Sequence, residues 1–160
     1  MSVSEGACFA HILERLTRDV LFQLEDVPEA DLNRQLELPE TNTLFALATH
    51  LVGAAEYWVL ALVGQRQISR DRAAEFQARG SFSELQERYD RWLQAMHEVL
   101  DALADNRLQE PVSQPTSYRY APPDRPLIVR DALLHAVEHC ALHLGHIQLT
   151  RQLLGLPVRT

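Results

Sequence analysis

The sequence predicts an all-α fold, a four-helix bundle, on three observations. The 160-residue chain contains four long segments whose apolar residues recur every three or four positions, which is the spacing of one helix face. No segment shows the sustained alternation of apolar and polar residues that indicates a strand. Apolar residues make up 46% of the chain and charged residues 23%, as in an ordinary globular protein. A single domain over residues 1–160 is therefore expected.

The first helix is predicted over residues 4–25. Four of its apolar residues lie four positions apart and build one continuous apolar face: Cys8, Ile12, Leu16 and Val20. Pro28 ends the helical pattern, because a proline inside a helix removes a backbone hydrogen bond and clashes with the preceding turn. The polar residues that follow, up to about residue 42, form the first predicted long connection.

The second helix is predicted over residues 43–63, with Asn42 or Thr43 as its cap and Gly64 as its stop. It is apolar on nearly all sides, so we expect it at the centre of the bundle. Its length approaches that of a membrane span, but a histidine and a glutamate lie within it. A buried helix is therefore the preferred interpretation.

The third helix is predicted to start at Ser81 and Glu84, which have the spacing of a capping box, and to extend to about residue 103. The fourth is predicted over residues 127–154, before a glycine and a nearby proline. Between them, the proline-rich residues 106–126 form a loop. The expected bundle thus has long crossover connections between helices one and two and between helices three and four.

Charge and cysteine content exclude several classes of function. The formal net charge is −7, and all 15 basic residues are arginines without a clustered stripe, which is unsuitable for binding nucleic acid. The absence of lysine excludes a lysine Schiff base and a P-loop. Cys8 and Cys140 do not form a C-x-x-C motif, so neither a disulfide framework nor a thiolate zinc site is expected. With no recognisable secretion signal or membrane association, a cytoplasmic location is predicted.

The most informative motif is HAVEHCALHLGH, residues 135–146, which holds four of the seven histidines. At about 100° per residue all four lie on a strip roughly 80° wide. Imidazoles three or four positions apart can reach one cation, so His135/His139, His139/His143 and His143/His146 all qualify as ligand pairs. Spacing alone does not choose among them, and a solvated or pH-sensitive face is the alternative.

A third ligand is expected from another helix, because two histidines rarely hold a metal firmly. His50 is the candidate, and Gly53 one turn later leaves space beside it. Three imidazoles leave a coordination position open for water or substrate, which is typical of catalytic sites. The sequence HCALH lacks the glutamate of the zinc-protease motif, and no nucleophile elbow occurs.

Two segments, TLFALATHLVGAAEYW (43–58) and HAVEHCALHLGHIQ (135–148), resemble the DinB-like (DinB/YfiT) superfamily of small bacterial metal-binding four-helix bundles. The resemblance implies one divalent metal per chain, held by His50, His139 and His143 with water completing the shell. Zinc or nickel is expected, and three imidazoles also suit iron and copper. The resemblance further implies a homodimer.

The chain departs from the family pattern at one position. Relatives commonly have Gly-Gln after the last ligand, whereas LGHI places His146 where that glutamine would be. His146 is therefore the candidate catalytic residue, as a hydrogen-bonding neighbour of His143 or as a general base. His135 is expected to be solvated near the end of the bundle.

The site and the resemblance are compatible with two enzymatic functions and one non-enzymatic function. Resemblance to thiol-dependent S-transferases and isomerases implies that the metal binds a low-molecular-weight thiol such as bacillithiol, mycothiol or glutathione and lowers its pKa. Arginines near the loop would bind the carboxylates of such a thiol, and the alternative is that they are ordinary surface arginines: Arg119, Arg125 and Arg130. Two tyrosines of the loop, Tyr118 and Tyr120, could line the pocket. The alternatives are hydrolysis of a small substrate and a non-catalytic, metal-stabilised ligand-binding bundle.

Overall fold

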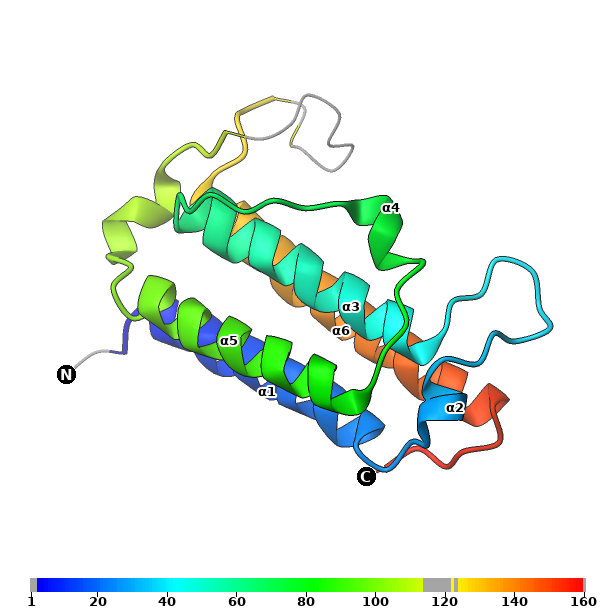
Figure 1. Ribbon diagram of the computed structural model, residues 1–160. Coiled ribbons are helices and arrows are strands. Elements are labelled where there is room, and N and C mark those ends of the chain that lie inside the picture. The colour runs from blue at the N-terminus through cyan, green and yellow to red at the C-terminus, as the bar shows by residue number, and fades with distance from the viewer. Residues whose placement is uncertain (1–2, 114–121, 123, 160) are drawn as a thin grey trace.

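The computed structural model describes residues 3–113, 122 and 124–159, and this part of the chain is a bundle of four long helices (Figure 1). The long helices are α1 (Glu5–Leu24), α3 (Leu44–Ala55) with its continuation η1 (Glu56–Val63), α5 (Phe82–Leu100) and α6 (Val129–Leu153). Three short helices lie in the connections: α2 (Glu29–Leu32), α4 (Arg72–Glu75) and the 3-10 helix η2 (Asp105–Gln109). The predicted all-α bundle is confirmed.

Helix starts follow the side-chain caps that the sequence predicts. Thr43, rather than Asn42, caps α3, because its hydroxyl accepts a hydrogen bond of 3.1 Å from the backbone N–H of Ala46. Ser81 and Glu84 form the complete capping box of α5, in which the Ser81 N–H donates to Glu84 Oε2 at 2.7 Å. Each such cap stabilises a helix by about 1 kcal/mol.

The second long helix is the buried centre of the bundle. Every residue of α3 is buried, as its all-round apolar sequence predicts. From Glu56 onward the backbone widens into π-helix, and the N–H of Gly64 donates to the carbonyl of Val59, five residues back, at 2.9 Å. By length and composition Leu44–Val63 could cross a membrane, but 78% of its most apolar 18-residue window is buried inside the bundle.

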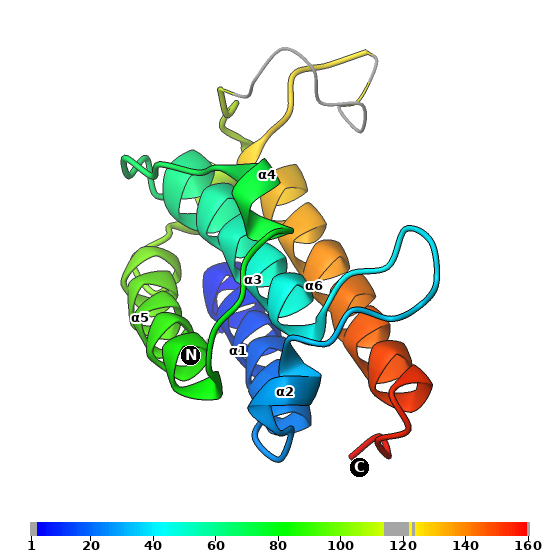
Figure 2. The same ribbon diagram turned by 45° about the vertical axis from the view of Figure 1, so that its right-hand side comes forward.

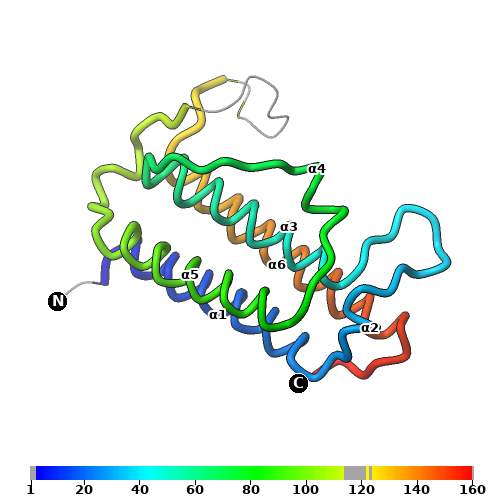
Figure 3. The backbone as a smooth tube through the Cα atoms, viewed as in Figure 1, coloured from blue at the N-terminus to red at the C-terminus, as the bar shows by residue number. Residues whose placement is uncertain are grey.

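The connection that crosses the bundle is not one of the two predicted. Helices α3 and α5 run in the same direction, so residues 64–81 travel back along the length of α3 before α5 begins (Figure 3). Residues 25–43 and 101–128 instead join helix ends that lie at the same end of the bundle. In the second of these, the Val112 N–H donates to the Leu127 carbonyl at 2.9 Å, which closes the base of the connection. The prediction of crossovers there is therefore wrong, because connection length in sequence does not reveal helix direction.

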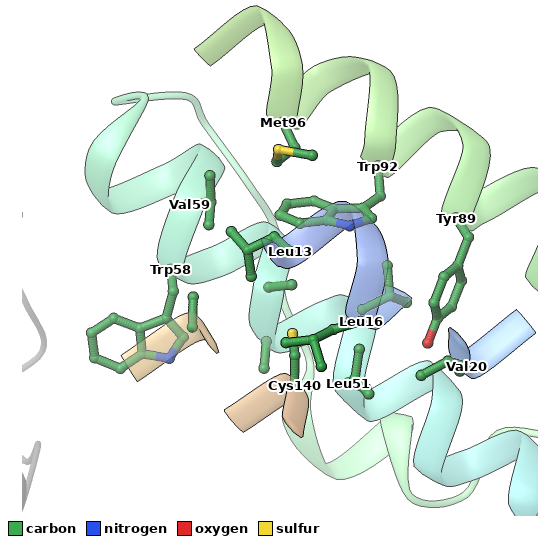
Figure 4. Close-up of a cluster of buried hydrophobic side chains, with 14 of the residues drawn as sticks. Leu13, Leu16, Val20, Leu51, Trp58, Val59, Tyr89, Trp92, Met96 and Cys140 are labelled. Carbon is green, nitrogen blue, oxygen red and sulfur yellow. The ribbon is translucent and has the colours of Figure 1, made fainter. Parts of the chain in front are cut away.

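Apolar side chains from all four long helices fill the centre of the bundle (Figure 4). Trp92 of α5 lies over Leu13 of α1, and Cys140 of α6 points into the same cluster. The predicted buried face of the fourth helix is confirmed, because its members are all buried: Ala132, Ala136, Cys140, Ile147 and Leu154. Burial raises the pKa of the Cys140 thiol to about 12. Cys140 is therefore a packing residue rather than a nucleophile.

Candidate metal centre

Three histidines from two neighbouring helices meet at one point. His50 comes from α3, and His139 and His143 come from successive turns of α6. One ring nitrogen from each lies within 4.8 Å of the others. The ring centres are 5.0 Å apart for His50 and His139, 4.8 Å for His50 and His143, and 4.3 Å for His139 and His143. The structure thus brings together the three predicted ligands.

Two ring nitrogens of the cluster approach each other between the two helices. Nε2 of His139 lies 3.2 Å from Nε2 of His50. Two nitrogens bound to one tetrahedral zinc at about 2.0–2.1 Å are separated by about 3.4 Å, so this spacing fits a shared ion. The other nitrogen of His139, Nδ1, is buried and has no hydrogen-bond partner among the described residues. The residues fit a divalent metal, since a cation between the rings would use both facing lone pairs.

Burial keeps the three imidazoles neutral at neutral pH. It lowers the pKa of His139 to about 2, with further contributions from the neighbouring imidazoles and Arg70, and it lowers the pKa of His143 to about 4. For His50, burial lowers the pKa more than the hydrogen bond to Glu75 raises it. Neutral imidazole is the form that binds a metal.

A buried carboxylate holds the other side of His50. Nδ1 of His50 lies 2.8 Å from Glu75 Oε2, and Arg70 donates to both carboxylate oxygens, at 2.7 and 2.9 Å. Burial raises the pKa of Glu75, but the hydrogen bonds from Arg70 and His50 outweigh it, so that pKa is lowered and Glu75 is ionised. An ionised carboxylate only accepts, so Nδ1 carries the proton and Nε2 faces His139.

Glu75 reaches this position because a short helix breaks the crossing segment. The Asp71 side chain accepts from the Ala74 N–H at 3.0 Å and caps α4, which lies against α3 (Figure 2). Phe76, which follows Glu75, places its ring centre 4.4 Å from the ring centre of His50. Glu75 could not be predicted from the sequence, since a glutamate in a short polar segment carries no periodic signal and lies 25 positions from His50.

The two outer histidines of the strip differ in their surroundings. The ring of His135 packs edge-on against Trp58 with 4.5 Å between ring centres, its side chain is only 16% exposed, and burial lowers its pKa. The expectation that His135 is solvated is therefore wrong, because the wide helix η1 brings an indole onto it. His146 is exposed, and its Nδ1 lies 3.3 Å from Nδ1 of His143. The predicted catalytic role of His146 stays a prediction.

Of the residues predicted to bind the ligand, the two that the structure describes are engaged in ion pairs. Arg125 is ion-paired to Asp131, with its Nη2 donating at 2.9 Å, and Arg130 is ion-paired to Glu5. The other three lie outside the described residues: Tyr118, Arg119 and Tyr120. No described contact therefore tests their role.

A second arginine of the crossing segment, Arg72, lies at the edge of the centre. Its guanidinium carbon lies 5.1 Å from the ring centre of Phe76, the ring that packs on His50. The pKa of His143 is lowered mainly by burial and by the neighbouring imidazoles, and the charge of Arg72 lowers it further. It is exposed, and within residues 3–113 and 124–159 it makes no ion pair. The Arg72 guanidinium, without an ion-pair partner among the described residues, thus lies beside the candidate centre.

A family model described as the DinB superfamily matches residues 12–147. The chain belongs to the DinB superfamily. Among solved structures, the DinB chain is similar to a conserved protein of locus from Enterococcus faecalis, with a TM-score of 0.74 and 14% identity over 96% of this chain and 98% of that chain. That likeness shows the shared fold. No curated protein matches the sequence. Superfamily membership and the three-histidine cluster together support a metal-binding DinB-like protein.

Proposed function

We propose that this DinB-superfamily protein is a metal-dependent enzyme that uses a low-molecular-weight thiol, as an S-transferase or isomerase acting on a small molecule. The observation that carries the proposal is the 3.2 Å approach of Nε2 of His50 to Nε2 of His139, with His143 beside them. Three imidazoles leave a coordination position open. A divalent cation there would supply Lewis acidity that lowers the pKa of a thiol or a water.

The nucleophile of such a reaction has to come from a co-substrate. Cys140 is fully buried, and its raised pKa keeps the thiol protonated. Cys8, the other cysteine, is exposed on the first turn of α1 and is absent from the three-histidine cluster. Neither thiol of the chain serves the centre, which favours a thiol that arrives with a soluble small molecule.

The chain offers two groups for handling that molecule. Arg72 presents a guanidinium without a carboxylate partner among the described residues, and low-molecular-weight thiols carry carboxylates that it would bind. His146 is exposed and uses Nδ1 toward His143, so its Nε2 would accept the proton that the thiol releases. These two residues take the roles of anion anchor and general base in the proposal.

Metal content and thiol binding test the proposal together. Elemental analysis of freshly purified protein is expected to find close to one divalent metal per chain. Calorimetric titration with glutathione, bacillithiol and mycothiol is then expected to show saturable micromolar binding of one thiol to the metal-loaded protein, and none to protein stripped with a chelator. Equal thiol binding by stripped protein, or an absence of metal, contradicts the proposal. Turnover of esters or amides without any thiol would instead identify a hydrolase, and inertness in both assays a binding protein.

The homodimer implied by the family resemblance is part of the same proposal. Four leucines on the outer face of α6 are about half exposed and support it: Leu134, Leu142, Leu149 and Leu153. Light scattering coupled to size-exclusion chromatography is expected to give twice the 18.2 kDa mass of the chain. A mass of one chain at micromolar concentration contradicts the dimer. The cytoplasmic location stays a prediction.

A further inference from the structure

We infer that Glu75 is a positioning residue of the metal centre, held by Arg70 and admitted by Gly53, which keeps Nε2 of His50 directed at the ion. The inference rests on the proposed metal site. It concerns the segment between η1 and α5, which contributes no ligand of its own. The crossing of residues 64–81 over α3 places this carboxylate at the centre (Figure 1).

Glu75 sets the orientation of the His50 ring. His50 is the single ligand from α3, so no second histidine on that helix helps to fix the metal. Its Nδ1 donates to Glu75 Oε2 at 2.8 Å, which selects the form in which Nε2 has the free lone pair. Phe76 packs on the same ring but has no polar atom to select a nitrogen. The choice of ligand nitrogen therefore depends on Glu75.

Arg70 in turn sets the orientation of the Glu75 carboxylate. Arg70 donates through Nε to Oε1 and through Nη2 to Oε2, so the carboxylate plane is fixed by two parallel bonds. Glu75 is 6% exposed and Arg70 18% exposed, which shields the pair from water. Arg70 thus keeps the Glu75 carboxylate aimed at Nδ1 of His50.

Gly53 leaves the space that the carboxylate occupies. A Cβ at position 53 would lie 2.3 Å from Glu75 Oε1 and 3.0 Å from Glu75 Cδ. Glycine is a poor helix former, and this one lies in a fully buried helix one turn after His50. A cavity of about 280 Å³, lined by Gly53, Arg70 and Glu75 among others, adjoins the pair. Gly53→Ala therefore has room to push the carboxylate aside without unfolding the helix.

The test measures zinc affinity and ring protonation separately. Competition with a chromophoric chelator gives the zinc dissociation constant of the wild type, Glu75→Gln and Gly53→Ala. We expect both variants to bind zinc about 10- to 100-fold more weakly, the usual effect of losing such a support. In metal-free protein, long-range ¹H–¹⁵N NMR is expected to show His50 protonated on Nδ1 in the wild type and to lose that preference in both variants.

Two matched controls separate positioning from general loosening. Gly145→Ala adds a Cβ that meets nothing within 4 Å, two residues after His143. Glu56→Gln breaks a comparable pair, in which Arg88 Nη2 lies 2.7 Å from Glu56 Oε2. Both controls are expected to keep wild-type zinc affinity and the Nδ1–H form of His50.

The possible outcomes fall into two groups. Wild-type affinity and an unchanged ring form in Glu75→Gln and Gly53→Ala would overturn the inference, as would a loss in Glu56→Gln equal to that in Glu75→Gln. If Glu75→Gln does not fold, Gly53→Ala decides alone. If the wild type binds no zinc or other divalent metal, the proposed function fails, and the NMR result still decides whether Glu75 selects the ring nitrogen.

Discussion

The two helices that form the metal centre support their histidines in different ways. On α3, His50 has one nitrogen facing the cluster and the other hydrogen-bonded to the buried carboxylate of Glu75. On α6, Nδ1 of His139 is buried without a hydrogen-bond partner among the described residues, and Nδ1 of His143 lies against exposed His146. His50 is oriented by the ion pair of Glu75 and Arg70, which comes from the crossing segment, whereas the other two ligands are oriented by their spacing on α6.

This difference shows how one and two ligands per helix are oriented. Imidazoles on successive turns converge because the helix itself sets their separation and direction. A single histidine has no such constraint, so its ring needs a partner from another part of the chain.

The largest expected effect is the loss of metal when any ligand is removed from either side. His50→Ala, His139→Ala and His143→Ala are each expected to abolish stoichiometric binding, because two imidazoles rarely hold a divalent ion firmly. Elemental analysis after gel filtration measures it. His135→Ala is the control and should retain the metal, since its ring packs on Trp58. Loss of metal only in that control would refute the assignment.

A second prediction concerns acid, which should act mainly through α6. The pKa values of His139 and His143, about 2 and about 4, lie below the value of about 6.5 in an unfolded chain. As the pH falls, the unfolded state therefore takes up protons before the folded state does. The contribution of these two histidines to the free energy of unfolding is fully present above pH 6.5 and is lost as the pH falls toward about 4 for His143 and about 2 for His139. Each histidine contributes at most about 1.4 kcal/mol per pH unit.

Urea unfolding of metal-free protein between pH 7 and pH 4.5 measures this loss. His139→Gln, which removes one of the two groups, should flatten the pH dependence of the unfolding free energy. His11→Gln, at an exposed position on α1, is the control and should leave it unchanged. Parallel curves for wild type and His139→Gln would show that His139 is not held neutral by the fold.

A third prediction addresses the solvent side of α6. If His146 accepts the thiol proton, His146→Gln should keep its metal but lower thiol-dependent turnover by about 100-fold, at the lower end of general-base effects. Unchanged turnover would restrict His146 to contact with His143.

The smallest expected effect is at Arg72, on the edge of the α3 side. Arg72→Gln should leave metal affinity intact and weaken binding of a carboxylate-bearing thiol by about three- to five-fold, as for an exposed charge pair. Arg15→Gln, at an exposed position on α1, is the matched control. Equal affinities of the wild type and Arg72→Gln for glutathione in calorimetry would exclude Arg72 as an anion anchor.

Much of the fold could be predicted because local interactions determine it. The capping box of Ser81 and Glu84, the cap at Thr43 and the apolar periodicity set where helices begin and which faces are buried. The spacing of His139 and His143 placed both on one strip. Choosing them over the other histidine pairs required the family resemblance, since four equally spaced imidazoles are equivalent along a single helix.

The sequence by itself thus determined the four helices, their apolar faces and the strip of four histidines, all of which follow from backbone hydrogen bonding and side-chain periodicity within one segment. Only the tertiary structure decided that residues 64–81 cross the bundle, that Trp58 covers His135, and that Glu75 supports His50. Each of these depends on contacts between residues far apart in the chain, and such contacts leave no periodic trace in either segment.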